Sequence, residues 1–119
     1  IAEGGLPQTR SLRTAMGAVA IVLPEEPGRQ LSRAYDDGRA AERMLIAASM
    51  LGLGGGIAWI RPDVRDLVRN LLALPVDRFV RTIVALGHPT EAARRPKSAP
   101  GKGRLPREEL IFEERWSNG

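Results

Sequence analysis

The sequence predicts a small α+β domain in which a sheet of a few strands is flanked by helices. Three stretches indicate this fold: a short apolar run at residues 18–23, a helical repeat of apolar residues at 64–72, and a β-branched run at 78–86. At 119 residues the chain can close one hydrophobic core and is short for two. The order strand, helix, strand, helix, strand, tail strand is that of a layered sandwich with incomplete helical cover.

The first strand is expected at residues 18–23. The preceding residues 1–16 carry Gly, Pro, Ser and Thr without a sustained period, which indicates a loop. The run AVAIVL is continuously apolar and is followed by Pro24. This pattern is typical of a short strand that is buried on both faces.

The first long helix is expected to begin near Ser32, which can cap it, and to stop at Gly52. Asp36 and Asp37 then lie near its start, where the helix dipole favours negative charge. Residues 44–51, MLIAASML, are apolar on every side apart from one serine. This part of the helix must therefore be covered all round, by its own domain or by a partner subunit.

Two further strands and a second helix are expected downstream. Residues 57–60 predict a short strand after a glycine cluster, and RFVRTIVAL at 78–86 predicts a central strand. Between them, Asp63 is expected to cap the clearest amphipathic helix of the chain. Its apolar positions follow the helical spacing i, i+3, i+4, i+7 and i+8: Val64, Leu67, Val68, Leu71 and Leu72.

The composition of the chain changes after residue 90. Residues 90–107 are rich in proline, glycine and cations, which predicts an extended basic loop with little core of its own. Residues 108–116 regain apolar side chains and are expected to form a terminal strand.

The composition excludes several kinds of site. The chain has no cysteine, which removes disulfides, thiolate metal sites and cysteine nucleophiles. His88 is the single histidine and is assigned no chemistry, because it follows a predicted strand and precedes a proline. No apolar run is long enough to span a bilayer and no secretion signal is visible, so no membrane partner and a cytoplasmic location are expected.

The positive net charge does not by itself indicate a nucleic-acid partner. The formal charge is +4, and 18 lysines and arginines minus the two lysines, Lys97 and Lys102, leave 16 arginines. Most of these alternate with acidic residues along the predicted helices, as on a solvated face. We therefore expect no nucleic-acid binding.

Four consecutive motifs together resemble the second half of nitroreductase-family flavoproteins. They are AYDDGRAAERMLIAASMLGLG, GGIAWIRPDVRDLVRNLLALP, RTIVALGHP and GRLPREELIFEERW, with a basic loop before the last. The resemblance covers about residues 18–116, so residues 1–119 are expected to form one domain of this kind that lacks the family's N-terminal half. It implies a homodimer with a mixed, mostly antiparallel sheet flanked by helices, and a C-terminal strand that is exchanged with the partner subunit.

The same resemblance implies an FMN-dependent enzyme that passes hydride from NAD(P)H through the flavin to an electron-poor acceptor such as a nitroaromatic or a quinone. No catalytic side chain and no metal are expected, because the cofactor does the redox chemistry. The N-terminal motifs that contact FMN in the family are absent from this chain. A truncated, non-catalytic dimerisation remnant of the same fold therefore stays open as the alternative.

The resemblance also implies where FMN would be held. Lys102 and Arg104 match the basic pair that contacts the phosphate, although by themselves they are typical of a solvated basic loop. Backbone groups beside the flavin ring would come from Gly55, Gly56, Ile57 and Ala58. Alone, this glycine cluster is typical of a helix end and a turn. Trp59 is expected to be a core or interface anchor rather than a group that stacks on the flavin.

Overall fold

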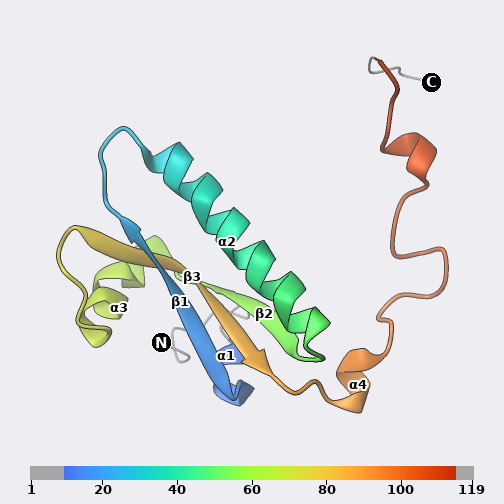
Figure 1. Cartoon of the computed structure of the whole chain (residues 1–119), viewed down its shortest axis with the longest axis horizontal. Helices are drawn as coiled ribbons and strands as arrows, with labels where there is room; N and C mark the ends of the chain where they lie inside the picture. Colours follow the sequence, from blue (N-terminus) through green and yellow to red (C-terminus); the bar gives the residue numbers. More distant parts are fainter. Residues whose placement is uncertain (1–9, 115–119) are drawn as a thin grey trace. The chain divides into compact units, whose positions relative to one another are not determined.

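The computed structural model describes residues 10–114, which divide into two compact units between His88 and Pro89 (Figure 1). The first unit holds the sheet and its helices, and the second holds the basic segment.

The first unit is built on a three-stranded antiparallel sheet. Its strands are β1 (Gly17–Pro24), β2 (Gly54–Trp59) and β3 (Arg78–Gly87), in the spatial order β1-β3-β2. The prediction that the run RFVRTIVAL forms the central strand is confirmed. Its apolar residues on both faces have a physical reason, because β3 is paired along both edges and packed on both sides.

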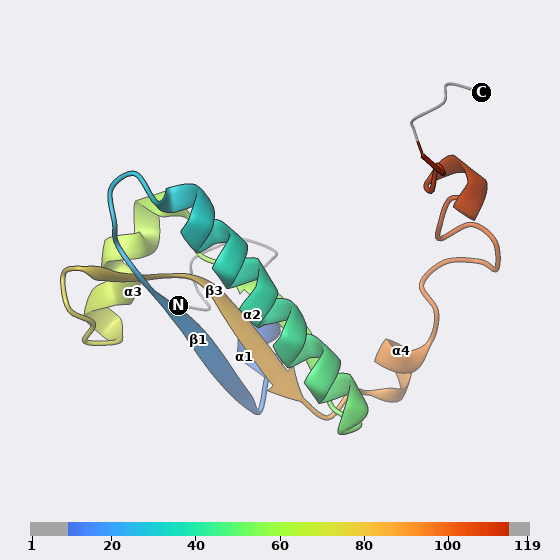
Figure 2. The same cartoon turned by 45° about the horizontal axis from the view of Figure 1, so that its top comes forward.

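Helices pack on opposite faces of this sheet. Consecutive residues of a strand point to opposite faces of the sheet. Ile57 and Ala58 are consecutive in β2, and they belong to two different clusters of buried apolar residues. The cluster of Ile57 includes Ala41 of α2 (Gln30–Met50), and the cluster of Ala58 includes Val68 of α3 (Arg65–Leu71). Figure 2 shows α2 running along the sheet. A four-residue helix, α1 (Ser11–Thr14), contacts β2.

The expectation that the first strand is buried on both faces is wrong. Ile21 and Leu23 are buried, but Val19 and Val22 are 39% and 45% exposed. The reason is the position of the strand: among residues 10–114, β1 is an edge strand whose one partner is β3, and α2 covers one of its faces. An apolar run predicts a strand with apolar side chains, but it does not tell how many strands and helices will pack around that strand.

The long helix ends where expected and begins earlier. Gly52 follows α2 with φ 75°, a left-handed conformation that glycine adopts without strain, and Leu53 N donates to Ala48 O at 2.8 Å. The helix starts at Gln30 without a side-chain cap, so the predicted cap at Ser32 is wrong. Asp37 consequently lies one turn further into the helix than the dipole argument requires.

The second helix is shorter than its apolar pattern. A 3₁₀ turn at Pro62–Val64 contains Asp63, and α3 follows it with no side-chain cap, so the predicted cap is wrong. Val68 is buried, but Leu67 and Leu71 are more than half exposed. Val68 thus supplies the main buried contact of this helix with β3.

The second unit is extended, as its composition predicts. It contains one helical turn, α4 (Glu91–Arg94), which Thr90 caps by accepting a 3.2 Å hydrogen bond from Ala93 N, and a 3₁₀ turn at Arg107–Glu109. The terminal strand expected at 108–116 does not form in the described part of that segment, up to residue 114. A strand needs a paired edge, so the exchange with a partner subunit stays a prediction.

Candidate binding pocket

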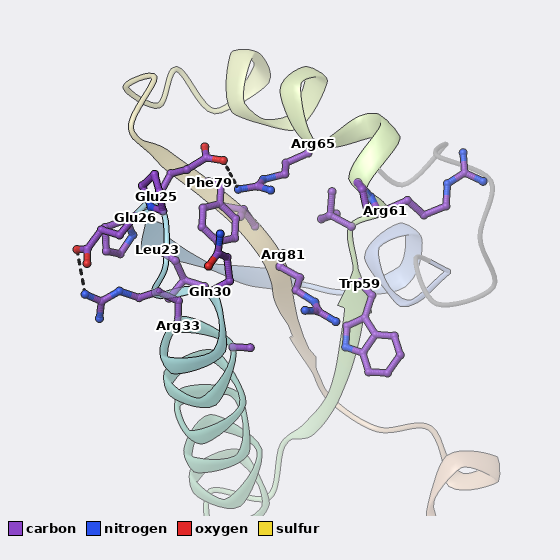
Figure 3. A pocket seen from close by; sticks show the side chains of 16 residues that line it. Leu23, Glu25, Glu26, Gln30, Arg33, Trp59, Arg61, Arg65, Phe79 and Arg81 are labelled. Atoms are coloured by element: carbon purple, nitrogen blue, oxygen red, sulfur yellow. Dashed lines mark hydrogen bonds and ion pairs between the residues drawn. The ribbon is translucent and has the colours of Figure 1, made fainter.

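The first unit has a pocket of about 560 Å³ at one end of its sheet (Figure 3). Four segments line it: the end of β1 with the turn after it, the first turns of α2, the end of β2 with the turn into α3, and the start of β3. Small-molecule sites usually measure roughly 300–1,000 Å³. The pocket is therefore large enough for a planar ligand of one to three rings.

Arginine dominates the polar lining. Arg33, Arg61, Arg65 and Arg81 line the pocket together with two carboxylates, Glu25 and Glu26. Four cations minus two anions leave a formal charge of +2 on the lining. The pocket thus attracts anions.

Two arginines are held by the neighbouring carboxylates. Arg33 pairs with Glu26 at 2.9 Å, and this hydrogen bond raises the pKa of the Arg33 guanidinium above its ordinary value. Arg65 pairs with Glu25 at 2.9 Å, and its guanidinium carbon lies 3.7 Å from the centre of the Phe79 ring. One wall of the pocket is therefore fixed by ion pairs and by a cation–π contact.

Glu25 also ties this wall to the second helix. Its other carboxylate oxygen accepts a 2.8 Å hydrogen bond from Arg69, which in turn donates through Nε to the carbonyl of Arg78 at 2.8 Å. The chain thus connects the turn after β1, helix α3 and the start of β3. The side chains on this wall are held in place without a ligand.

The opposite side of the pocket is less constrained. Arg61 pairs with Asp63 at 2.8 Å, and both side chains are largely exposed. Within residues 10–114, Arg81 has no side-chain hydrogen bond or ion pair. Its guanidinium lies on the same side of the pocket as the indole of Trp59, which is 54% exposed (Figure 3).

A β-bulge presents Arg81. On β1 the step from Ala20 to Val22 spans two residues, whereas the paired step on β3, from Ile83 to Val80, spans three. Thr82 and Val84 both face α2, as residues two apart do in a regular strand. The extra residue on β3 interrupts this alternation at Arg81, which lines the pocket and does not join Ile83 in the core cluster of the opposite face.

Thr82 is joined to α2 through a buried hydrogen bond. Its hydroxyl donates to Asp37 Oδ2 at 2.7 Å, and both residues are 4% exposed. The other oxygen, Asp37 Oδ1, is buried and has no hydrogen-bond partner among the described residues. Thr82 also pairs in register with Trp59 of β2, so this buried pair lies directly behind the Arg81 side of the pocket.

The glycine cluster of the sequence lies in a strand and not in a loop. Gly55, Gly56, Ile57 and Ala58 all belong to β2 and pair with β3. None of them lines the pocket, which begins with the next residue, Trp59. Gly55 has a packing reason to be glycine, because an added Cβ would lie 2.6 Å from Leu45 Cδ2 of α2. Their role beside a flavin stays a prediction.

Lys102 and Arg104 lie in the second unit, where both are exposed. Neither side chain forms an ion pair within the described residues of that unit. Both are therefore available for an anionic ligand, and their contact with a phosphate stays a prediction. His88, to which no chemistry was assigned, is also exposed.

Sequence reasoning missed the arginines of the pocket. Arg33 and Arg65 are among the helical arginines that alternate with acidic residues, and this pattern was interpreted as a solvated face. For these two the available signal was positional, because both stand near the starts of predicted helices, where neighbouring elements meet. Arg81 lies inside the predicted strand at 78–86 and carries no such signal. Trp59, expected to be an anchor, lines the pocket with half of its surface exposed.

Other kinds of site find no support in the described part of the chain. Residues 10–114 contain no group of three or more His, Asp or Glu placed to hold a metal ion. In the same residues, no helix combines the length and the apolar character that crossing a bilayer requires.

Comparison with known proteins identifies the fold. No protein-family model matches the sequence, and no curated protein matches it. Among solved structures, the chain is similar to a protein described as an NADH oxidase of Clostridium acetobutylicum (TM-score 0.71, 19% identity, 97% of this chain and 68% of that one). It is also similar to a protein of Parabacteroides distasonis described as an NADH dehydrogenase/NAD(P)H nitroreductase (TM-score 0.71, 23% identity, 97% and 65%).

A third similar structure is a nitroreductase family protein of Clostridium difficile (TM-score 0.60, 20% identity, 90% of this chain and 67% of that one). The chain thus spans about two thirds of the length of these proteins. Nearly all of the chain takes part in each match. The resemblance expected from the four motifs is confirmed at the level of architecture: this chain has a nitroreductase-like α+β fold.

Proposed function

We propose that this chain is a flavin-dependent oxidoreductase that uses FMN to pass electrons from NAD(P)H to a nitroaromatic or a quinone. The observation that carries the proposal is the match of 97% of the chain, at a TM-score of 0.71, to proteins described as an NADH oxidase and as an NADH dehydrogenase/NAD(P)H nitroreductase. The overall reactions balance without a further reactant. NAD(P)H, a proton and a quinone give NAD(P)⁺ and a hydroquinone, and with a nitro group they give a nitroso group and water.

The chemistry of hydride uptake belongs to the flavin, and the protein supplies binding and orientation. Two features of this chain fit that cofactor. Lys102 and Arg104 are exposed and without ion pairs in the described residues, as a phosphate site requires. Among the described residues, β2 is an edge strand, so alternate backbone groups of Gly55 to Ala58 face away from β3 and have no strand partner there that would compete with a planar ring.

A homodimer is part of the proposal. The outward face of α2 exposes large apolar side chains along its length: Leu31, Tyr35, Ile46 and Met50. Leu51, directly after the helix, is 76% exposed. A second copy of the chain that covers this face would remove these side chains from water.

The decisive experiment is flavin uptake by the purified chain. Titration with FMN is expected to quench flavin fluorescence and to leave a yellow protein after gel filtration, and the loaded protein is expected to oxidise NADPH when menadione or 4-nitrobenzoate is added. A colourless protein that takes up no added FMN would contradict the proposal. If that colourless protein were a dimer by sedimentation, the result would support the second candidate function.

That second candidate is a non-catalytic dimerisation module of the same fold. It is favoured by the exposed apolar side chains of α2. It predicts self-association with no flavin binding. Flavin uptake with NADPH turnover would exclude it.

A further inference from the structure

The polar groups of the pocket are unequally satisfied, and this inequality indicates where a ligand binds. Arg33 forms an ion pair with Glu26, and Arg65 forms one with Glu25, so both charges are compensated within the pocket wall. Arg61 is paired with Asp63 outside the lining. Among the described residues, Arg81 is the cation of the lining that has no carboxylate partner. The side of the pocket near Trp59 therefore carries an uncompensated positive charge.

A β-bulge and neighbouring hydrogen bonds fix the backbone at Arg81. A bulge interrupts the regular pairing of β1 with β3, and the buried Thr82–Asp37 hydrogen bond fixes the residue next to Arg81. The carbonyl of Arg81 itself accepts a 2.8 Å hydrogen bond from Ile60 N, and on its other side Val80 pairs with Val22 of β1. The backbone on both sides of the Arg81 side chain is therefore fixed, and its guanidinium is directed at the pocket while it stays solvated.

The remaining lining favours a flat, partly apolar molecule. Trp59 presents its indole next to Arg81, and Phe79 lies across the pocket with the Arg65 guanidinium against its ring. The apolar residues Leu23, Ile60 and Val80 also line the pocket. Arginine forks two hydrogen bonds onto a carboxylate, and aromatic faces stack on a planar ring.

We propose that this pocket binds a planar aromatic carboxylate, with Arg81 holding the carboxylate and Trp59 packing on the ring. The ligand class rests on the pocket alone. Its role as the electron acceptor rests on the proposed function, and in that role it makes the preferred acceptor an anionic aromatic compound and not a neutral one.

Equilibrium binding with matched probes tests this ligand class without any flavin. The probes are 4-nitrobenzoate and the neutral, nearly isosteric 4-nitrobenzamide. Their binding to the full chain is measured by ligand-observed NMR. The acid is expected to bind more tightly than the amide. R81Q is expected to weaken binding of the acid about tenfold and to leave the amide unchanged.

R43Q is the matched control, because Arg43 is exposed on α2, does not line the pocket and carries the same charge. It is expected to leave the affinity for 4-nitrobenzoate within twofold of the parent chain. Equal binding of the acid and the amide, or equal losses in R81Q and R43Q, would overturn the proposal. Circular dichroism of both variants checks that the fold is kept, and within residues 10–114 the exposed Arg81 side chain has no hydrogen bond or ion pair that its removal would break.

A competition experiment with FMN distinguishes the two anionic groups that Arg81 could bind, the carboxylate of an aromatic acid and the phosphate of FMN. FMN that displaces 4-nitrobenzoate competitively, with R81Q weakening both, would show that the pocket belongs to the cofactor and would overturn the proposal. Simultaneous binding supports it, and the loaded protein is then expected to lose its preference for the acid over the amide in kcat/KM when Arg81 is replaced. Arg81-dependent binding of the acid in a chain that takes up no FMN would contradict the proposed function and leave the ligand class of the pocket as stated.

Discussion

Thr82 Oγ1 donates a 2.7 Å hydrogen bond to Asp37 Oδ2 and so joins the bulge of the central strand to the middle of helix α2. Both residues are buried, and they are 45 positions apart in the sequence. The pair links the packing of the core with the position of Arg81, its neighbour in the pocket.

Replacement of Thr82 by valine is expected to destabilise the fold. It keeps the shape of the side chain but leaves a buried carboxylate without a donor, at a cost of about 1–3 kcal/mol. Urea unfolding followed by circular dichroism measures the loss. Thr82→Ser retains the hydroxyl and is expected to lose less. A Thr82→Val variant as stable as the parent chain would show that the hydrogen bond does not stabilise this contact.

Replacement of Gly55 by alanine is expected to destabilise the packing of α2 on β2. The new Cβ would lie 2.6 Å from Leu45 Cδ2, so the helix or the side chain must shift, at a cost of about 1–3 kcal/mol. Because Cδ2 is the end of a flexible side chain, a value near the lower limit is expected. Gly38→Ala is the control, since no atom lies within 4 Å of its added Cβ and the exposed site in α2 favours alanine by about 0.5–1 kcal/mol. A stabilised Gly55→Ala variant would show that Leu45 moves aside freely.

Replacement of Ala73 by glycine is expected to stabilise the chain. Ala73 has φ 52° directly after α3, and its neighbour Leu74 N donates to Arg69 O at 3.0 Å, as at a helix end that glycine usually occupies. Relief of the left-handed strain, less the greater entropy of glycine in the unfolded chain, gives about 0.5–1 kcal/mol. Thermal unfolding measures the gain. A lower melting temperature would mean that the methyl group of Ala73 contributes more through packing than it costs in strain.

Replacement of Arg104 by alanine is expected to weaken FMN binding about tenfold while the fold is kept, because one forked contact to the phosphate is lost. Fluorescence titration gives the dissociation constant. Arg107→Ala is the matched control from the same basic segment, since Arg107 stands outside the basic pair. Unchanged flavin affinity in Arg104→Ala would remove this residue from the phosphate site.

The sequence was sufficient to predict the order and type of the elements of the first unit from β1 onward, whereas the short helix α1 at Ser11–Thr14 was expected to be a loop. The run at 78–86 is apolar on both faces because β3 is central, and Gly52 stops α2 because only glycine takes that conformation freely. The two caps at Ser32 and Asp63 could not be predicted correctly, because each helix begins within two or three residues of a suitable side chain that it does not use.

The site was harder to predict for a different reason. Arg81 reaches the pocket because of a bulge, and a register shift between strands leaves no trace in the period of either strand. Gly55 was interpreted as a position for approach to a ligand, but its Cβ is excluded by Leu45, ten residues earlier. Both depend on contacts between segments, which composition and spacing do not contain.

Glu25 and Glu26 follow β1 directly, and their carboxylates point to different helices, Glu25 to Arg65 and Arg69 of α3 and Glu26 to Arg33 of α2. Because α2 and α3 cover opposite faces of the sheet, this one dipeptide connects the two helical layers through ion pairs. The ion pairs are partly exposed, so dissolved salt weakens the ion pairs to both helices together. The width of the pocket mouth should accordingly depend on the ionic strength around the protein.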